Sequence, residues 1–356
     1  MVETMLRGRD FINTQEWTKG ELDTVIDVSL DLKRRFATRE PHELLKGKTL
    51  FLLFYNPSNR TRNSFEAGMT QLGGHAHFLS PDTMYRPGLE EEKKVGTTLV
   101  KETGESIGDT ARVLSSYGDA IAIRIFQDPT LWIYGRGNKV IREFAKYATI
   151  PVINMEDDVY HPCQAMADLL TVKEKFSNLE GKKVALTWAY SPKDRTIGVH
   201  QSAALVFTRY AMDVVVAHPE GFEFDPQVIG DCKKNVEAFG GSFKVEHDFE
   251  AALENADIVM PKSWQSLRFV PPQAKQPNLA GAREYASKFE DWKCTQEKMD
   301  LVNRGAIYMH CGPVDRGSEV TDEVVDGPNS VVFQQAENRL HAQKGIMALV
   351  MGGPPR

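Results

Sequence analysis

The sequence predicts an α/β protein of two domains, each built on a doubly wound parallel sheet. A chain of 356 residues is long for one hydrophobic core, since domains average about 150 residues. Apolar runs typical of buried strands alternate with amphipathic helical stretches along almost the whole chain. Such alternation is typical of parallel sheets covered by helices on both faces.

The first domain is expected to span residues 1–155 and to be completed by the C-terminal segment 334–356. Thr18 and Glu21 form a capping-box pattern at the start of a helix that reaches about Arg35. A continuous apolar run at 49–55 predicts a buried strand, and a helix follows until Gly73. Further predicted strands and helices alternate at 76–80, 105–117, 120–126, 139–148, 151–155 and 162–176.

The second domain is expected to span residues 156–333. Its predicted strands lie at 184–190, 214–217, 243–246, 258–261 and 307–310, with helices between them. The segments 81–101 and 265–291 interrupt the alternation, and each is either a functional loop or a surface insertion. A last helix at 336–351 has no strand after it, so we expect it to pack back on the first domain.

The composition is that of an ordinary globular protein, with 41% hydrophobic residues, 26% charged residues and a net charge of −6. The acidic balance disfavours a general nucleic-acid binder. The longest apolar run, 50–55, is far shorter than the ~18 residues of a membrane helix. No basic and apolar leader opens the chain, so a cytoplasmic location is expected.

Several kinds of cofactor and metal site are disfavoured. The four cysteines are widely spaced and form no C-x-x-C, which argues against a disulfide framework or a zinc ribbon. No cluster of histidines and carboxylates suggests another metal. Neither domain shows G-x-G-x-x-G after its first strand, which weakens a nicotinamide oxidoreductase considerably.

Residues 56–62 read Asn-Pro-Ser-Asn-Arg-Thr-Arg and lie between a predicted strand and a predicted helix. The helix dipole and the free N–H groups of a helix N-terminus favour an anion there. Arg60 and Arg62 can bind phosphate oxygens through paired N–H groups, and the Ser58 and Thr61 hydroxyls can donate beside them. This favours a phosphate site, although a solvated turn with a capping residue has the same composition.

Four other residues could carry chemistry. Arg124 falls within a predicted buried strand, so it either forms an internal ion pair or points at an anion beyond the strand's carboxyl end. His161 and Gln164 flank Pro162 at the start of a helix, as capping residues or as donors around a carbonyl oxygen. Cys311 follows the last strand, where a free cysteine is most often a small apolar residue.

Together these motifs resemble the aspartate/ornithine carbamoyltransferase family over nearly the whole chain. The motifs, in the order that the family has, are 58–62, Arg124, His161-Pro162-x-Gln164, His310-Cys311-x-Pro313 and Glu337-Asn338-Arg339-Leu340-His341. The resemblance implies a cytoplasmic carbamoyltransferase of arginine biosynthesis, with a carbamoyl-phosphate domain, an acceptor domain and no cofactor. It also implies a homotrimer whose active sites are shared between subunits.

The resemblance assigns roles to individual residues. The residues implied to bind carbamoyl phosphate are Ser58, Asn59, Arg60, Thr61, Arg62, Arg124, His161, Gln164 and Arg339. Those implied to be catalytic are Arg124, His161, Gln164 and Cys311, and those implied to contact the acceptor are Glu156, Lys262, Trp264, Cys311, Gly312 and Asp315. Fixed donors suit the reaction, because negative charge grows on the carbamoyl oxygen when an amine attacks.

The chain is closest in motif to the N-acylornithine branch of the family. It lacks the D-x-x-x-S-M-G motif of ordinary ornithine enzymes and the H-P-L-P-R motif of aspartate enzymes. Residues 262–264, Lys-Ser-Trp, and the turn at 187–192 are similar to the acylornithine branch. The acceptor domain of that branch carries a deep trefoil knot, so a knotted second domain is expected.

Asp315 departs from this branch, whose members read H-C-L-P-L-R-R where this chain reads H-C-G-P-V-D-R at 310–316. The expected arginine would help to hold the acceptor. Either Arg316, Arg268 or Lys262 takes that role, or the acceptor differs, or Asp315 points to solvent without consequence. The acceptor is then ornithine, an N-acylornithine or another amine, and the physiological direction stays open.

The segment 81–101 matches the family's loop that reaches into a neighbouring subunit. It contains Met84, Tyr85, Arg86 and the acidic run 90–92, which are able to shape an acceptor pocket. A silent anion-binding regulator with the same fold is the alternative from another class of protein. A silent protein would need no donors that face a carbamoyl group, so the intact set argues against such a regulator: Arg60, Arg62, Arg124, His161 and Gln164.

Overall fold

The computed structural model describes residues 6–85, 87–89, 105–270 and 277–352. The chain divides into two compact units, the first formed by 1–166 with 339–356 and the second by 167–338. The divisions expected from the sequence lie at 155 and 333. They fall later because the chain passes between the units inside two helices, α7 (Pro162–Lys175) and α14 (Val332–Met351), where the sequence pattern shows no break.

The first unit is built on a four-stranded parallel sheet with the strand order β2-β1-β3-β4. Its strands are β1 (Thr49–Phe54), β2 (His75–Leu79), β3 (Ala120–Arg124) and β4 (Val152–Glu156). The strands β1, β3 and β4 are buried apart from the first residue of β1, which explains their near-continuous apolar sequences.

Helices cover this sheet. On one side α5 (Ile107–Tyr117) and α6 (Arg136–Tyr147) share an apolar core with alternate residues of β1 and β3, including Phe51 and Ile121. The helices α1 (Lys19–Thr38), α2 (Asn59–Gln71) and α14 pack together. A Cβ at Gly345 of α14 would meet Ser29 of α1, so these two backbones approach closely. The capping box predicted at the start of α1 is present.

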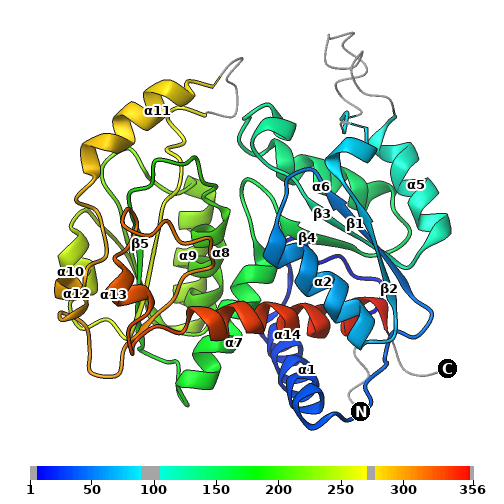
Figure 1. Cartoon of the computed structure of the whole chain (residues 1–356), viewed down its shortest axis with the longest axis horizontal. Helices are drawn as coiled ribbons and strands as arrows, with labels where there is room; N and C mark the ends of the chain where they lie inside the picture. The colour runs from blue at the N-terminus through cyan, green and yellow to red at the C-terminus, as the bar shows by residue number, and fades with distance from the viewer. Residues whose placement is uncertain (1–5, 86, 90–104, 271–276, 353–356) are drawn as a thin grey trace. The chain divides into compact units, whose positions relative to one another are not determined.

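The second unit is built on a five-stranded parallel sheet with the strand order β7-β6-β5-β8-β9. The strands are β5 (Lys183–Trp188), β6 (Asp213–Ala217), β7 (Ser242–Glu246), β8 (Ile258–Lys262) and β9 (Ile307–Tyr308). Figure 1 shows helices α8 (Gly198–Arg209) and α9 (Pro226–Phe239) on one face and α10 (Phe249–Leu253) on the other. The predicted parallel-sheet class is confirmed for both units, and the knot stays a prediction.

Two segments differ from the sequence-based expectation. The stretch 265–291, expected to be irregular, contains helix α11 (Leu279–Ala286), which Asn278 caps by accepting from the Gly281 N–H group. Of the segment 81–101, Arg86 and the acidic run 90–92 lie outside the described residues. Two short helices, α12 (Gln296–Met299) and α13 (Asp322–Val325), complete the second unit.

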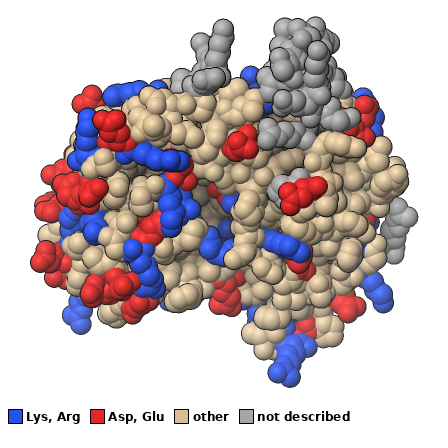
Figure 2. Space-filling view, turned by 45° about the horizontal axis from the view of Figure 1, so that its top comes forward, with Lys and Arg blue, Asp and Glu red and all other residues tan. Residues whose placement is uncertain are grey.

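Acidic and basic side chains intermingle on the face of the molecule shown in Figure 2, in keeping with the small net charge. None of the helices that the structure describes has both the length and the apolar character to cross a membrane.

Candidate active site

The loop between β1 and α2 forms the first part of the site, in the first unit. Ser58 caps α2 by accepting from the Thr61 N–H group at 3.2 Å. Asn56 fixes the loop from the other side, because its Oδ1 accepts from the Phe126 N–H group at 2.9 Å. The N-terminus of α2, whose dipole favours an anion, is thereby held at the carboxyl edge of the sheet.

The two arginines at the start of α2 have different surroundings. The Arg62 side chain binds Glu66 at 3.0 Å and stacks over the Phe78 ring, with 3.6 Å between the guanidinium carbon and the ring centroid. Arg60 is half-buried, and its charge helps to lower the pKa values of His161 and Arg339. The structure therefore brings Arg60, but not Arg62, towards the other predicted site residues.

Arg124 forms an ion pair with Glu156. Arg124 ends β3 and Glu156 ends the neighbouring strand β4, opposite it across a shift in strand register. An Arg124 Nη1 donates to the Glu156 carboxylate, and both side chains are buried. Glu156 was expected to contact the acceptor, whereas in the structure it lies with the groups predicted to bind carbamoyl phosphate.

His161 and Gln164 lie at the start of α7. His161 Nε2 is 3.4 Å from the Glu156 carboxylate. Burial lowers the pKa of His161 well below its usual value. The negative charge of Glu156 acts to raise this pKa, whereas the positive charges of nearby arginines, Arg339 foremost, lower it further. The imidazole is therefore neutral near pH 7 and can donate or accept a hydrogen bond without carrying charge.

Arg339 of α14 joins the separate motifs of the first unit. Its Nη1 donates to Gln164 Oε1 at 2.7 Å and its Nη2 donates to Thr61 Oγ1 at 3.2 Å. The side chain is buried. Arg60, Arg124 and Arg339 all act electrostatically on His161, and the carboxylate of Glu156 acts on it against them. This surplus of positive charge suits a phosphate dianion, and the neutral donors suit a carbonyl oxygen beside it.

The second unit holds the residues predicted to contact the acceptor other than Glu156. Lys262 ends β8 and is buried, and its Nζ lies 3.4 Å from the Ser263 carbonyl oxygen. Trp264 is also buried, with its indole N–H donated to the Phe222 carbonyl oxygen at 2.9 Å. Trp264 further packs against the His200 ring, with 5.0 Å between the ring centroids.

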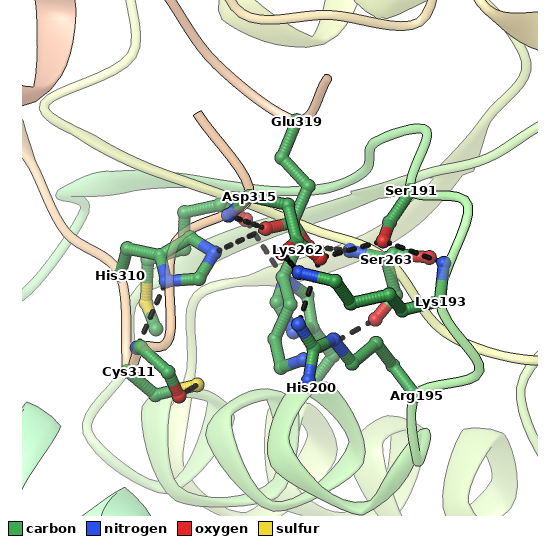
Figure 3. Close-up of polar contacts among 12 residues, drawn as sticks. Ser191, Lys193, Arg195, His200, Lys262, Ser263, His310, Cys311, Asp315 and Glu319 are labelled. Atoms are coloured by element: carbon green, nitrogen blue, oxygen red, sulfur yellow. Dashed lines mark hydrogen bonds and ion pairs between the residues drawn. The ribbon is translucent and has the colours of Figure 1, made fainter. Parts of the chain in front are cut away.

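Asp315 is buried, which excludes the expectation that it points to solvent. Its carboxylate accepts from the Ser191 hydroxyl at 2.6 Å, from Arg195 Nη2 at 2.7 Å and from Lys193 Nζ. Figure 3 shows these three side chains converging on Asp315. Burial by itself would raise the pKa of Asp315, but these partners lower it to about 2, so the group is ionised at neutral pH.

Glu319 ties three segments of this region together. Its carboxylate accepts from the N–H groups of Ser263 at 2.7 Å and Asp315 at 2.9 Å, and it lies 3.2 Å from His310 Nε2 (Figure 3). The Gly312 N–H group donates to the other ring nitrogen of His310, Nδ1, at 2.8 Å. Glu319 thus fixes the end of β8 and the loop after β9 to each other.

The predicted residues Cys311 and Gly312 belong to the loop after β9. The Cys311 thiol is half-buried, in contrast to the buried Cys163, Cys232 and Cys294. Gly312 adopts φ = 65°, a backbone conformation that favours glycine. Arg316, one candidate for holding the acceptor, instead binds Asp322 and Asp326 on the surface.

Four residues of this region were not predicted from the sequence to belong to the site: Ser191, Lys193, Arg195 and Glu319. A signal for three of these residues was present, because the turn 191–195, Ser-Pro-Lys-Asp-Arg, follows the carboxyl end of β5 and carries two cations. The carboxyl ends of parallel strands are where α/β proteins place their ligands. Glu319 gave no such signal, since its partners are 56 residues away at Ser263 and close by at Asp315.

Comparison with known protein families covers both units. Residues 9–174 match the model of the aspartate/ornithine carbamoyltransferase carbamoyl-P binding domain, and residues 180–350 match the Asp/Orn binding domain. The N-acetylornithine carbamoyltransferase of Xanthomonas campestris pv. campestris is 40% identical over 97% of this chain and 98% of its own. The ornithine carbamoyltransferase of Thermococcus kodakarensis is 40% identical over 98% of each chain.

Solved structures give the same result. An acetylornithine transcarbamylase complexed with acetylcitrulline superposes with a TM-score of 0.87 at 37% identity, over 97% of this chain and 99% of that one. The ornithine carbamoyltransferase from Pyrococcus furiosus superposes with a TM-score of 0.84 at 39% identity, over the whole of both chains. This chain therefore belongs to the aspartate/ornithine carbamoyltransferase family.

Proposed function

We propose that this protein transfers the carbamoyl group of carbamoyl phosphate to the amine of an ornithine-like amino acid and releases phosphate. The observation that carries the proposal is the buried cluster of the first unit. Arg339 contacts both Thr61 and Gln164 there, and neutral His161 lies beside the ion pair of Arg124. Such a cluster offers cations for a phosphate and neutral donors for a carbonyl oxygen.

The chemistry needs little more than positioning and fixed charge. A neutral amine attacks the carbamoyl carbon, the carbamoyl oxygen gains negative charge, and the bond to the phosphate oxygen breaks. Donors aimed in advance at that oxygen lower the barrier because they need no reorganisation. His161 and Arg124 are the residues that we assign to the carbamoyl oxygen, and Arg60 and the α2 N-terminus to the leaving phosphate. The leaving phosphate can accept the amine proton.

We assign the acceptor to the second unit, where Lys262 and the loop 310–315 lie near Glu319. The relatives named above are N-acetylornithine and ornithine carbamoyltransferases, which supports an acceptor of this kind. Ornithine and its N-acyl derivatives share an aliphatic chain with an amine at one end and a carboxylate near the other. Either compound presents the same nucleophile to the carbamoyl carbon.

Mass-spectrometric detection of ureido products tests the proposal. The protein is given carbamoyl phosphate with ornithine, N-acetylornithine, N-succinylornithine, lysine, putrescine or agmatine, and calorimetry measures carbamoyl-phosphate binding in parallel. We expect a product from ornithine or from an N-acylornithine. Failure to bind carbamoyl phosphate would overturn the proposal and favour a silent relative of the family. Binding without a product from any of these amines would overturn the choice of acceptor.

We also propose a cytoplasmic homotrimer with active sites shared between subunits, on the strength of the family resemblance. Complementation provides the test. Mixing an Arg60→Ala protein with a protein that lacks residues 81–101 should restore activity if the two parts of one site come from different subunits. No recovery of activity after subunit exchange, with each variant trimeric by analytical ultracentrifugation, would contradict sharing.

A further inference from the structure

A small pocket opens in the second unit between the turn after β5 and the segment after β8. Arg195 and Lys193 line it from the first side, Trp264 and Gln265 from the second, and Ala282 of α11 from a third. Its free volume is about 20 Å³. A pocket of that volume holds about one water-sized group, such as one end of a larger ligand.

The pocket carries an excess of positive charge. Asp315 pairs with two cations, Lys193 and Arg195, so these three side chains together carry a net charge of one positive unit. The other charged residues that line the pocket, Asp194 and Arg283, pair with each other. An anionic group is therefore the charge type that the pocket favours.

Two hydrogen-bond donors in the pocket lining have no partner among the described residues. They are Arg195 Nε and Gln265 Nε2, and both atoms are buried. A buried donor without an acceptor is costly, so such groups call for a ligand atom or an ordered water. Arg195 has 19% of its side chain exposed, against 63% for Lys193, so Arg195 is the better-fixed cation of the two.

The remaining wall of the pocket is apolar. Trp264, Phe222 and Ala282 contribute to it. The combination of a fixed guanidinium, a free amide donor and an apolar wall matches a carboxylate carried on a short aliphatic chain.

Building on the proposed function, we infer that this pocket binds the carboxylate of the acceptor substrate, that Arg195 is the residue that selects for it, and that Asp315 positions Arg195. The other candidate cations are less suited. Arg316 is bound to two surface aspartates, and Arg268 stacks over the Tyr285 ring at 5.5 Å. Lys262 does not line the pocket, and its charge acts on Glu319 instead. An acidic residue at position 315 is therefore compatible with an acceptor that carries a carboxylate, because Arg195 replaces the arginine expected at that position.

Matched pairs of amines test this inference. Ornithine and putrescine differ only by the carboxylate, as do N-acetylornithine and N-acetylputrescine. Steady-state rates at saturating carbamoyl phosphate are measured for the unmodified protein, Arg195→Gln, Arg195→Lys and Arg316→Gln. The last variant removes the same charge from a residue whose partners lie on the surface, so it is the matched control.

We expect the unmodified protein to prefer the carboxylated member of a pair at least tenfold in kcat/KM. Arg195→Gln should lose most of this preference through a higher KM for the carboxylated amine, without a comparable change for its decarboxylated partner. Arg195→Lys should recover part of the preference, and Arg316→Gln should keep it. A loss confined to kcat would indicate a structural disturbance and would count against the inference.

Three results would overturn the inference: equal rates for both members of a pair in the unmodified protein, full discrimination in Arg195→Gln, or no reaction with any of the four amines. Calorimetry measures carbamoyl-phosphate binding to each variant. Because we assign that binding to the first unit, normal binding with one of these results would count against the inference alone, whereas absent binding in the unmodified protein would count against the proposed function. If circular dichroism shows that Arg195→Gln does not fold, the Arg195→Lys variant provides the test. In that variant, an unchanged preference for the carboxylated amine together with an unchanged KM would count against the inference.

Discussion

Glu319 lies 3.2 Å from His310 Nε2, and neither side chain is accessible to solvent. The same carboxylate accepts two backbone N–H groups, those of Ser263 and Asp315. Burial alone would raise the pKa of Glu319, but His310, the charge of Lys262 and the Ser263 N–H group lower it to about 2. Glu319 is therefore ionised at neutral pH and holds together the loops that we assign to the acceptor.

Glu319→Gln should destabilise the second unit. The amide keeps one acceptor oxygen but turns an NH₂ group towards backbone donors, which leaves at least one buried group unpaired. We expect a loss of about 1–3 kcal/mol of unfolding free energy, seen as a lower thermal midpoint by circular dichroism. Glu323→Gln, an exposed position on α13, is the control and should behave like the unmodified protein. Equal midpoints for Glu319→Gln and the control would refute this role for Glu319.

The two arginines at the start of α2 should differ in their effect on carbamoyl-phosphate binding. Arg60→Gln should weaken binding about 10- to 100-fold, because one charge-assisted hydrogen bond contributes about 1.5–3 kcal/mol. Arg62→Gln should weaken it much less, because Arg62 binds Glu66 and stacks on Phe78. Calorimetric titration measures both dissociation constants, and a larger effect at Arg62 than at Arg60 would contradict the geometry.

Thr61 and Gln164 could be singled out from the sequence because they lie at helix starts, whereas Arg339, inside α14, was assigned by the family resemblance. Thr61, Gln164 and Arg339 were each assigned to one site, and the structure brings them into contact. The partner of Arg124 was not predicted as such: an ion pair was one of two interpretations, and Glu156 was assigned to the acceptor. A pattern reveals that a buried charge needs a partner, but only the register of β3 against β4 shows which residue provides it.

The second cluster was predicted less completely for a related physical reason. Asp315 was singled out as unusual, yet its partners Lys193 and Arg195 lie more than 100 residues earlier in the chain. Ion pairs between distant segments leave no periodic signal in a single sequence. The same holds for Glu319, whose role depends on where two separate loops end in space.

His161 should support activity as a neutral group. Burial and the surrounding arginines lower its pKa well below the usual value, so it does not titrate near pH 6.5. We expect kcat between pH 5.5 and 8 to show no inflection that depends on His161. His161→Gln, which keeps a neutral donor, should retain more activity than His161→Ala, for which a loss of about 100-fold or more is expected. An inflection near pH 6.5 that disappears in His161→Gln would argue for a protonated imidazole instead.

Asp157 and Asp158 should contribute more to the stability of the first unit in mild acid than at neutral pH. Burial raises the pKa of both carboxyl groups, and the charge of Asp157 raises that of Asp158 further, to about 7. A carboxyl whose pKa is higher in the folded than in the unfolded state contributes stability below its unfolded value of 3.8, and that contribution is lost as the pH rises through the folded value. The contribution of this pair to the thermal midpoint should therefore fall between pH 5 and pH 8, while buried His161, whose pKa is lowered, contributes in the opposite direction.

Asp158→Asn should flatten this dependence, because it removes one titrating group and the repulsion that the group exerts on Asp157. The variant can have a lower thermal midpoint at every pH, because the substitution weakens the hydrogen bonds from the N–H groups of Gly137 and Asn138. The difference between the midpoint of the variant and that of the unmodified protein should nevertheless shift in favour of the variant as the pH rises from 5 to 8. Asp109→Asn, with 65% of the Asp109 side chain exposed, serves as the control and should leave the slope unchanged. If the midpoint of Asp158→Asn follows that of the unmodified protein in parallel across this range, the buried acid pair does not set the pH dependence.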